Sequence, residues 1–251
     1  MEKWQERTEL LFKTEGLRNL KNAHVLVVGL GGVGSFAVEF LARAGVGNLT
    51  IVDGDIVDIT NINRQLPALH SSVGMPKVNV VGDRLMDINP KLQLYRIEEF
   101  LSPERAFEIV SPKYDYVLDC IDSVTPKLNL IFACKRNRVK VISSMGAGGK
   151  MDASKVKVAN IKNTVHCHLA KTIRKRLKKM NIDKLKVVFS SEIQDACSLK
   201  MTDGTNYKRS FYGTNSYMPC LFGLYAAETV IRYLLKKENS SRSQSQISDN
   251  S

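Results

Sequence analysis

The sequence predicts an α/β fold in which a mostly parallel sheet is flanked by helices. Short apolar runs rich in β-branched residues, such as residues 24–28 and 48–52, are typical of buried parallel strands. Segments with apolar residues at helical spacing alternate with these runs, and this alternation is the pattern that builds a parallel sheet. A glycine-rich turn, residues 29–34, joins the first strand to the first of these helices.

This first strand–turn–helix–strand unit predicts a Rossmann-like nucleotide-binding arrangement. The turn contains Gly29, Gly31, Gly32 and Gly34, and the helix extends to about residue 44. Glycines let the backbone approach a phosphate closely, and the helix N-terminus supplies free N–H groups and a positive dipole. Asp53 follows the second strand, where an acid can bind ribose hydroxyls. A tight turn without a ligand is the less favoured interpretation.

The composition is typical of a reduced, cytoplasmic protein. The chain has 251 residues, 43% of them hydrophobic, and a net charge of +12 that favours an anionic partner. The apolar runs are shorter than the ~20 residues that span a bilayer, and the polar N-terminus shows no secretory signal. The five cysteines are never spaced as CxxC, which argues against disulfides and a structural zinc site.

The remaining periodic segments complete the expected fold. Helices are predicted near residues 2–20, 77–89, 103–110, 126–137, 170–180 and 218–235, and strands near 92–97, 116–122, 139–144, 155–161 and 186–189. We expect residues 1–236 to form one nucleotide-binding domain, in which 155–213 is a C-terminal elaboration that binds substrate. The Ser/Asn/Gln-rich residues 237–251 are predicted to be a disordered tail.

Polar side chains follow several of these elements at the predicted carboxyl edge of the sheet. They comprise Asp53, Asp55, Asn61, Arg64, Lys77 and Asp122. Two cations can neutralise a triphosphate and stabilise charge that develops during attack at phosphorus, while an acid can hold Mg²⁺. The set favours ATP with Mg²⁺ over a nicotinamide dinucleotide, which would leave Arg64, Lys77 and Asp122 without a role. Taken singly, Arg64 and Lys77 could be solvated surface charges.

Five motifs in order resemble the ubiquitin-activating-enzyme superfamily, the ThiF/MoeB-like ATP-dependent adenylyltransferases. They are residues 29–35, 53–55, 61–65, Lys77 and 119–122, and the likeness covers about residues 5–236. The resemblance implies an ATP/Mg²⁺ site that activates a carboxylate as an acyl-adenylate. It implies that Asp53 and Asn61 bind ribose and phosphate, that Arg64 and Lys77 bind the triphosphate and that Asp122 holds Mg²⁺. It also implies a homodimer in which Arg7 reaches the partner's site.

Within the superfamily, the chain is similar to the tRNA threonylcarbamoyladenosine dehydratase branch. The similarity lies in residues 121–127, 146–149, 169–171 and 189–192. It implies that ATP activates the threonyl carboxylate of the modified adenosine beside the tRNA anticodon, and that loss of water then closes a ring. The missing cysteine pairs also argue against an enzyme that activates a ubiquitin-like sulfur carrier at its C-terminal glycine. A sulfurtransferase or cysteine desulfurase partner remains open.

The predicted helix at residues 170–180 carries six cations and no acid. They are Lys171, Arg174, Lys175, Arg176, Lys178 and Lys179, which suit the phosphate backbone of tRNA. A merely solvated helix face is the alternative interpretation, and charge reversal tests it. The glycine-rich turn at 146–149 could bring substrate close to backbone or only turn the chain.

The chain departs from the branch at His166-Cys167-His168, where Asp-Pro is expected before Leu-Ala-Lys. Adjacent residues rarely converge on one metal ion, so surface or partly buried residues are favoured. Cys197 and Cys220 lack a neighbouring base, and neither is predicted to be catalytic; Cys220 is expected to be a small core residue. Three alternatives stay open: a sulfur-carrier adenylyltransferase, a NAD-dependent oxidoreductase and a non-catalytic nucleotide-gated adaptor.

Overall fold

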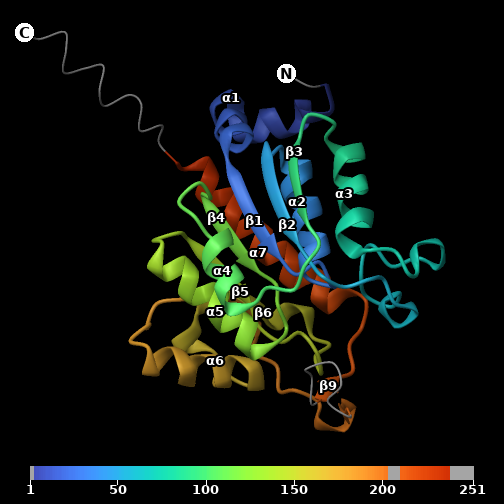
Figure 1. Ribbon diagram of the computed structural model, residues 1–251, viewed down its shortest axis with the longest axis vertical. Coiled ribbons are helices and arrows are strands. Elements are labelled where there is room, and N and C mark those ends of the chain that lie inside the picture. The colour runs from blue at the N-terminus through green and yellow to red at the C-terminus, as the bar shows by residue number, and fades with distance from the viewer. Residues whose placement is uncertain (1–2, 203–209, 238–251) are drawn as a thin grey trace, which may run out of the picture.

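The protein is described by a computed structural model for residues 3–202 and 210–237, and it has the α/β architecture that the sequence predicts (Figure 1). Seven strands form one sheet in the order β3-β2-β1-β4-β5-β7-β6. All neighbours pair in parallel except β6, which runs antiparallel to β7 at the edge. The strands are β1 (His24–Val28), β2 (Asn48–Val52), β3 (Gln93–Ile97), β4 (Tyr116–Asp119), β5 (Val141–Ser144), β6 (Val156–Asn160) and β7 (Lys186–Ser190).

Helices cover both faces of the sheet. On one face, α2 packs against α3 and α7, and α1 also packs against α7; on the other face, α5 lies between α4 and α6. The helices are α1 (Glu6–Asn22), α2 (Gly34–Ala44), α3 (Lys77–Ile88), α4 (Pro103–Ile109), α5 (Val124–Arg136), α6 (His168–Lys179) and α7 (Tyr217–Leu235). None of the described helices is long and apolar enough to cross a membrane.

Strand β1, which lies inside the sheet, shows why the protein has two hydrophobic cores. Val25 and Val27 belong to the core shared with α2 and α7, whereas Leu26 and Val28 belong to the core shared with α5 and α6. Successive side chains of a strand point to opposite faces, so a strand covered on both sides must be apolar throughout. The uninterrupted apolar run at residues 25–28 therefore follows directly from the position of β1 in the middle of the sheet.

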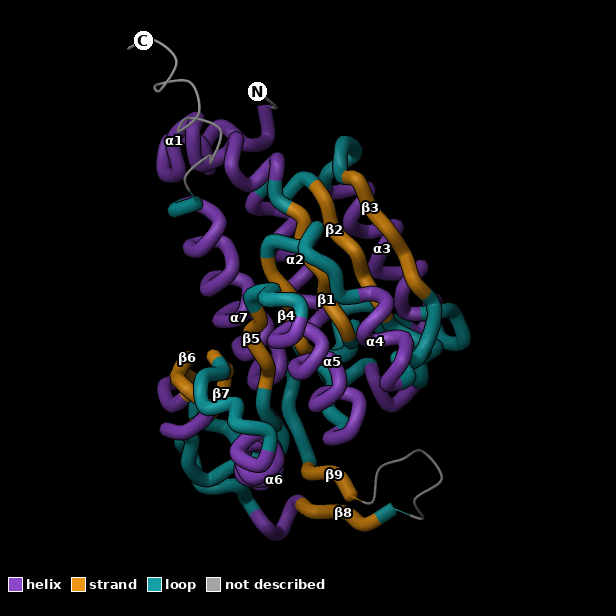
Figure 2. The backbone as a smooth tube through the Cα atoms, turned by 60° about the vertical axis from the view of Figure 1, so that its left-hand side comes forward, coloured by secondary structure: helices purple, strands orange, loops and turns teal. Residues whose placement is uncertain are grey.

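The predicted elements agree with the structure, with differences mainly at their ends. Helix α5 begins at Val124 and not at Pro126, because a proline is tolerated in the first turn, where its missing N–H has no helical partner. Between residues 189 and 218, where the sequence predicts no helix or strand, the structure has a short antiparallel pair of β8 (Leu199–Met201) and β9 (Ser210–Tyr212), which Figure 2 shows apart from the main sheet. Strands of three residues leave too little periodicity to predict. Nearly all of the expected disordered tail, residues 238–251, lies outside the described part of the chain.

Candidate active site

The glycine turn and Asp53 form one hydrogen-bonded unit at the carboxyl edge of the sheet. Leu30 N donates to Asp53 Oδ2 at 2.5 Å, and Asp55 N donates to Asp53 Oδ1 at 2.8 Å. Burial raises the pKa of Asp53, while the hydrogen bond from Leu30 N and the charge of Lys77 act in the opposite direction. Both carboxylate oxygens therefore accept hydrogen bonds from backbone N–H groups. Through these bonds Asp53, which lies at this edge, also fixes the shape of the turn.

The glycines of the turn serve different purposes. A Cβ on Gly34 would lie 1.7 Å from Gly29 O, and Gly29 has φ +90° with a Cβ position 2.9 Å from Cys120 O. A Cβ on Gly32 would meet Pro219 at 2.9 Å. A Cβ on Gly31 would meet nothing nearer than Gln65 at 3.7 Å, which is an ordinary contact. The fold thus requires Gly29, Gly32 and Gly34, whereas at Gly31 packing leaves room for a side chain and a ligand explains the glycine better.

Lys77 approaches the turn from the start of α3. Its Nζ lies 2.8 Å from Asp55 Oδ2, and its side chain is 6% exposed while that of Asp55 is 54% exposed. Lys77 N also donates to Asp55 O at 3.0 Å, which fixes the first turn of α3 against the loop after β2. The buried ammonium group lies close enough to Asp53 to lower the pKa of that carboxyl. The structure therefore brings Asp53, Asp55 and Lys77 into one cluster.

Arg64 and Asp122 come together from two different loops. Burial lowers the pKa of Arg64, and the negative charge of Asp122 raises it, which places the two side chains near each other. Arg64 Nη1 donates to Thr60 O at 2.9 Å and to Asn63 Oδ1 at 2.7 Å. The backbone and the base of the Arg64 side chain lie beside Gly32, whose Cβ position would be 3.1 Å from Arg64 O and 3.5 Å from Arg64 Cγ. An arginine, an acid and the glycine turn thus share one region.

Asn61 shapes the loop that carries Arg64. Its side-chain Oδ1 accepts from Asp58 N at 3.3 Å, and its carbonyl oxygen accepts from Arg64 N and Gln65 N at 3.0 and 2.9 Å. Within the described residues its Nδ2 makes no hydrogen bond, although the residue is buried. The amide nitrogen of Asn61 is therefore available to donate to a ligand.

Two buried polar atoms at this edge lack hydrogen-bond partners within the described residues. They are Gln65 Oε1, beside Gly31, and Thr214 Oγ1, next to the segment that Asn63 contacts through Thr214 O at 3.3 Å. Buried polar groups without partners are uncommon in native folds and often mark a ligand position. Together with the cations Arg64 and Lys77, they fit a polar, anionic ligand such as ATP. Asp122, with phosphate oxygens and water, also fits the few protein ligands that Mg²⁺ uses in such sites.

A fully buried ion pair supports the carboxyl end of β4, and sequence patterns did not single it out. Lys127 Nζ lies 2.7 Å from Asp119 Oδ2 and also donates to Ser143 Oγ and Ser144 O, at 3.1 and 2.9 Å. Ser143 Oγ donates to Asp119 Oδ2 at 2.5 Å, and Ile121 N donates to Asp119 Oδ1 at 3.1 Å. Burial raises the pKa of Asp119, and Lys127 lowers it. The network joins β4, α5 and β5 and so positions the loop of Asp122.

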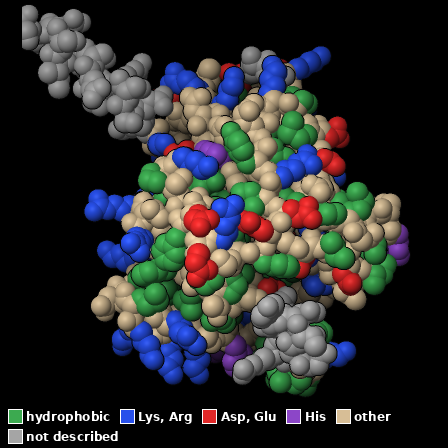
Figure 3. Space-filling model, in the orientation of Figure 1, with side chains coloured by type: hydrophobic (Ala, Val, Ile, Leu, Met, Phe, Trp, Pro, Cys, Tyr) green, Lys and Arg blue, Asp and Glu red, His purple; other side chains and the backbone are tan. Residues whose placement is uncertain are grey.

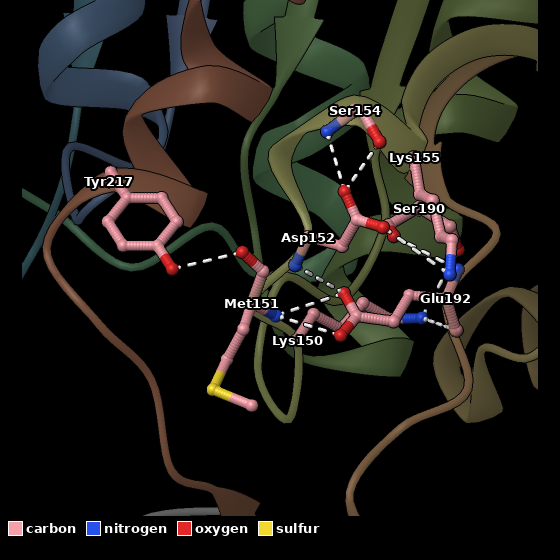
Figure 4. Close-up of polar contacts among 8 residues, drawn as sticks. All are labelled: Lys150, Met151, Asp152, Ser154, Lys155, Ser190, Glu192 and Tyr217. Atoms are coloured by element: carbon pink, nitrogen blue, oxygen red, sulfur yellow. Dashed lines mark hydrogen bonds and ion pairs between the residues drawn. The ribbon is translucent and has the colours of Figure 1, made fainter.

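A second buried lysine, Lys150, joins the glycine-rich turn after β5 to the elaboration (Figure 4). Its ammonium group donates to the carbonyl oxygens of His166, Ser190 and Glu192. The Glu192 carboxylate in turn accepts from Met151 N and Asp152 N, at 2.9 Å each to Oε2. Sequence reasoning missed Lys150, because nothing in its neighbourhood signals that three carbonyl groups from distant segments converge on it. The nearby Gly148 and Gly149 pack against Tyr212, so this turn also serves the fold.

The predicted basic helix is α6, and most of its cations face solvent. Lys171, Lys175, Arg176, Lys178 and Lys179 are exposed, and Figure 3 shows Lys and Arg side chains gathered over α6. Arg174 differs, because its Nη1 donates to Thr164 O at 2.8 Å and to Thr164 Oγ1 at 2.6 Å. Its guanidinium group therefore fastens the segment before α6 and is half-buried. A hollow of about 270 Å³ lies at the start of α6, lined by His166, His168 and Lys171 among others.

Arg7 does not reach the carboxyl edge within one chain. It lies exposed in the first turn of α1, and α1 leads into the amino end of β1, at the opposite edge of the sheet. Next to it on α1, Leu10 and Leu11 are 71% and 74% exposed. The predicted role of Arg7 therefore depends on a second copy of the chain.

The histidines and cysteines make no metal cluster within the described residues. His168 stacks on Tyr212 with ring centroids 6.3 Å apart, and the Cys167 thiol caps α6 by accepting from Ala170 N. Cys197 is exposed, whereas Cys220 is only partly buried and so is less of a core residue than predicted. Burial raises the pKa of Cys220, which disfavours its reactive thiolate form.

The fold and the cluster at the carboxyl edge define a nucleotide-binding protein of the α/β class. The chain belongs to the ThiF family, whose model matches residues 6–250. It is 37% identical over 246 residues to the tRNA threonylcarbamoyladenosine dehydratase of Haemophilus influenzae, with 91% of this chain and 92% of that protein covered. The enzyme of the same name from Bacillus subtilis is 39% identical over 238 residues, covering 92% of this chain and 94% of the relative.

Comparison with solved structures also finds similarity to a tRNA threonylcarbamoyladenosine dehydratase. The crystal structure of Escherichia coli tRNA N6-threonylcarbamoyladenosine dehydratase in complex with ATP superposes with a TM-score of 0.84 at 33% identity, and covers 97% of this chain and 98% of that one. By contrast, the molybdopterin-synthase adenylyltransferase of Haemophilus influenzae is 40% identical over only 138 residues, which cover 55% of this chain and 56% of the relative.

Proposed function

We propose that this chain is an ATP-dependent tRNA threonylcarbamoyladenosine dehydratase. The observation that carries the proposal is the extent of the likeness: the Haemophilus influenzae and Bacillus subtilis dehydratases match more than nine tenths of both chains, which includes most of the elaboration around α6. The adenylyltransferase that is similar to this chain matches little more than half of it. We infer that the shared half holds the nucleotide site and that substrate choice lies in the rest of the chain.

The arrangement of the site supports activation of a carboxylate by ATP. We assign the backbone at Gly31 and the Asn61 amide to ATP binding, and Arg64 and Lys77 to the phosphates. When the threonyl carboxylate oxygen attacks a phosphorus atom of ATP, a P–O bond to the leaving phosphate breaks and a mixed anhydride forms. Arg64 and Lys77 offset the negative charge that develops on the phosphate oxygens. Mg²⁺, which we place at Asp122, would screen the same phosphates.

Ring closure then completes the dehydration. A nucleophilic atom of the same threonylcarbamoyl group attacks the activated carbonyl carbon and loses its proton. The former carboxylate oxygen leaves on the phosphate group, so the substrate loses the elements of one water. The buried Lys127–Asp119 pair takes no part in bond making, because both groups are enclosed; it positions the Asp122 loop.

The assembly that we propose is a homodimer in the cytoplasm that acts on tRNA. Support for the dimer comes from Arg7, which is exposed and remote from its own site, and from the exposed apolar side chains of Leu10 and Leu11 beside it. Support for tRNA comes from the exposed cations of α6, whose N-terminus lies by the glycine turn after β5: Gln194 bridges His168 N and Gly148 O, at 3.1 and 3.0 Å. No described contact bears on a sulfurtransferase partner.

Mass spectrometry of nucleosides tests the function. The protein is incubated with ATP, Mg²⁺ and tRNA that carries threonylcarbamoyladenosine, and the tRNA is then digested to nucleosides. We expect a modified nucleoside that is lighter by one water, and only when ATP is present. Protein that binds ATP but leaves the nucleoside unchanged refutes the proposal. A parallel incubation with a sulfur-carrier protein that ends in Gly-Gly tests the alternative, for which ATP–pyrophosphate exchange is the expected signal.

A further inference from the structure

A basic cleft lies at the amino edge of the sheet, on the side of the molecule opposite to the nucleotide site. Its volume is about 740 Å³, and it is enclosed by the beginnings of β4, β5 and β7, the end of β6 and the ends of α5 and α7. Five cations line it: Lys135, Arg138, Lys140, Lys184 and Lys186. We call this feature the amino-edge cleft. Nothing in the proposed chemistry uses it.

None of the described acidic side chains neutralises the positive charge of the amino-edge cleft. No acidic side chain lines it among the described residues, and within that part of the chain none of its five cations forms an ion pair. The acids nearest in sequence are Asp115 and Asp183; Asp115 pairs with Lys237, and Asp183 is exposed beside Lys184. Burial lowers the pKa of Lys135, and the charge of Lys140 lowers it further. Like charges held together without a counter-charge favour the binding of an anion.

The amino-edge cleft continues the basic face of α6. Helix α6 starts at the carboxyl edge, where Gln194 accepts from His168 N, and its last turn carries Lys178 and Lys179. The six residues after Lys179 lead to β7, whose first residue, Lys186, lines the cleft. Lys135 Nζ, in the last turn of α5, donates to Lys184 O at 2.6 Å and so joins α5 to the chain that leaves α6. Figure 3 shows Lys and Arg side chains over α6 and along the same side of the molecule.

We propose that the amino-edge cleft binds the sugar–phosphate backbone of the tRNA at a distance from the modified base. The inference rests on the proposed function, and it extends the tRNA contact beyond α6. Twelve helical residues span about 18 Å, and the chain that leaves α6 enters the cleft at Lys184 and Lys186. Cations spread along such a path suit a repeating polyanion better than a single small phosphate, which needs converging donors.

A pair of matched charge reversals tests the proposal in the full-length protein. The test variant is Lys140→Glu with Lys184→Glu. The control is Lys21→Glu with Lys91→Glu, two exposed lysines at the end of α1 and before β3 that make the same change in net charge. The dissociation constant is measured by direct binding over a series of salt concentrations, with full-length tRNA and with an anticodon-loop heptanucleotide.

We expect the test variant to bind full-length tRNA about ten-fold or more weakly than the control, with a salt dependence reduced by about two counterions. Binding of the heptanucleotide and of ATP should change equally little in both variants. Equal affinity for tRNA in the test and control variants overturns the proposal. It is also overturned if the test variant loses as much affinity for the heptanucleotide as for full-length tRNA. Since binding is measured without turnover, failure of the dehydration reaction would be seen separately and would refute the proposed function instead.

Discussion

Lys127 Nζ and Asp119 Oδ2 lie 2.7 Å apart, and both side chains are completely enclosed. Removing one partner of such a pair leaves an uncompensated charge in the interior. We predict that Lys127→Met lowers the free energy of unfolding by about 3–5 kcal/mol. Urea denaturation measures the change. The double variant Lys127→Met with Asp119→Leu is the control, because it removes both charges and should recover part of the loss. A single variant as stable as the wild type would contradict the role of the pair.

The glycine turn offers two substitutions with opposite consequences. Gly34→Ala forces a Cβ to within 1.7 Å of Gly29 O, so we expect loss of folded protein. Gly31→Ala meets only an ordinary contact at 3.7 Å, so stability should change by less than about 1 kcal/mol while ATP binds about ten-fold or more weakly. Thermal unfolding and ATP titration measure the two effects. If Gly31→Ala bound ATP normally, the ligand would not approach this glycine.

The two cations of the site should be needed for chemistry more than for folding. We expect Arg64→Ala and Lys77→Ala to reduce turnover at saturating ATP by at least a hundred-fold, because charge that develops on phosphate then lacks its partner. Lys77→Ala should also cost some stability, since its ammonium group is buried beside Asp55. Single-turnover kinetics followed by nucleoside mass spectrometry provide the measurement. Near-normal rates in both variants would remove these residues from the mechanism.

Charge reversal on α6 separates a tRNA surface from a solvated face. We expect Lys171→Glu with Lys175→Glu to raise the KM for tRNA about ten-fold and to weaken its salt dependence, with little change in kcat. Both side chains are exposed, so stability should be unaffected. Steady-state kinetics at several salt concentrations measure the effect, and the Lys21/Lys91 double variant serves again as the control. Unchanged tRNA affinity would show that the helix is only solvated.

His24 should make stability depend on mildly acidic pH. Burial lowers the pKa of its imidazole below the usual 6.5, and the charge of Lys113 lowers it further, while the charge of Asp115 acts in the opposite direction. The unfolded chain therefore binds this proton at a higher pH than the folded chain. The contribution of His24 to the free energy of unfolding should be fully present above about pH 6.5 and should be lost progressively as the pH falls below that value. Denaturation from pH 7.5 to 5.5 measures the slope, and His24→Gln should make that slope shallower.

The βαβ unit shows how much local sequence can predict. The apolar run at 24–28, the glycines of 29–34 and Asp53 act through short-range causes: burial on both faces of a strand, backbone conformation and a helix terminus. These causes are visible within 30 or so residues of sequence, so both the fold class and the place of the nucleotide site follow from them. The elements that they follow predict that Arg64, Lys77 and Asp122 lie at the carboxyl edge; in the structure Lys77 pairs with Asp55, and Arg64 lies near Asp122.

Only the tertiary structure reveals the contacts between segments that lie far apart in the chain. No local pattern marks Lys127 or Lys150 as buried, yet carbonyl or carboxylate oxygens from distant segments surround each ammonium group. The amino-edge cleft likewise combines cations from the end of α5 and the segment before β5 with lysines at the start of β7, and no local sequence pattern links the two groups. Periodicity and motif spacing predict secondary structure and sites that are formed by residues close together in the sequence. The pairing of distant charges depends on packing and desolvation, which exist only once the sheet has formed.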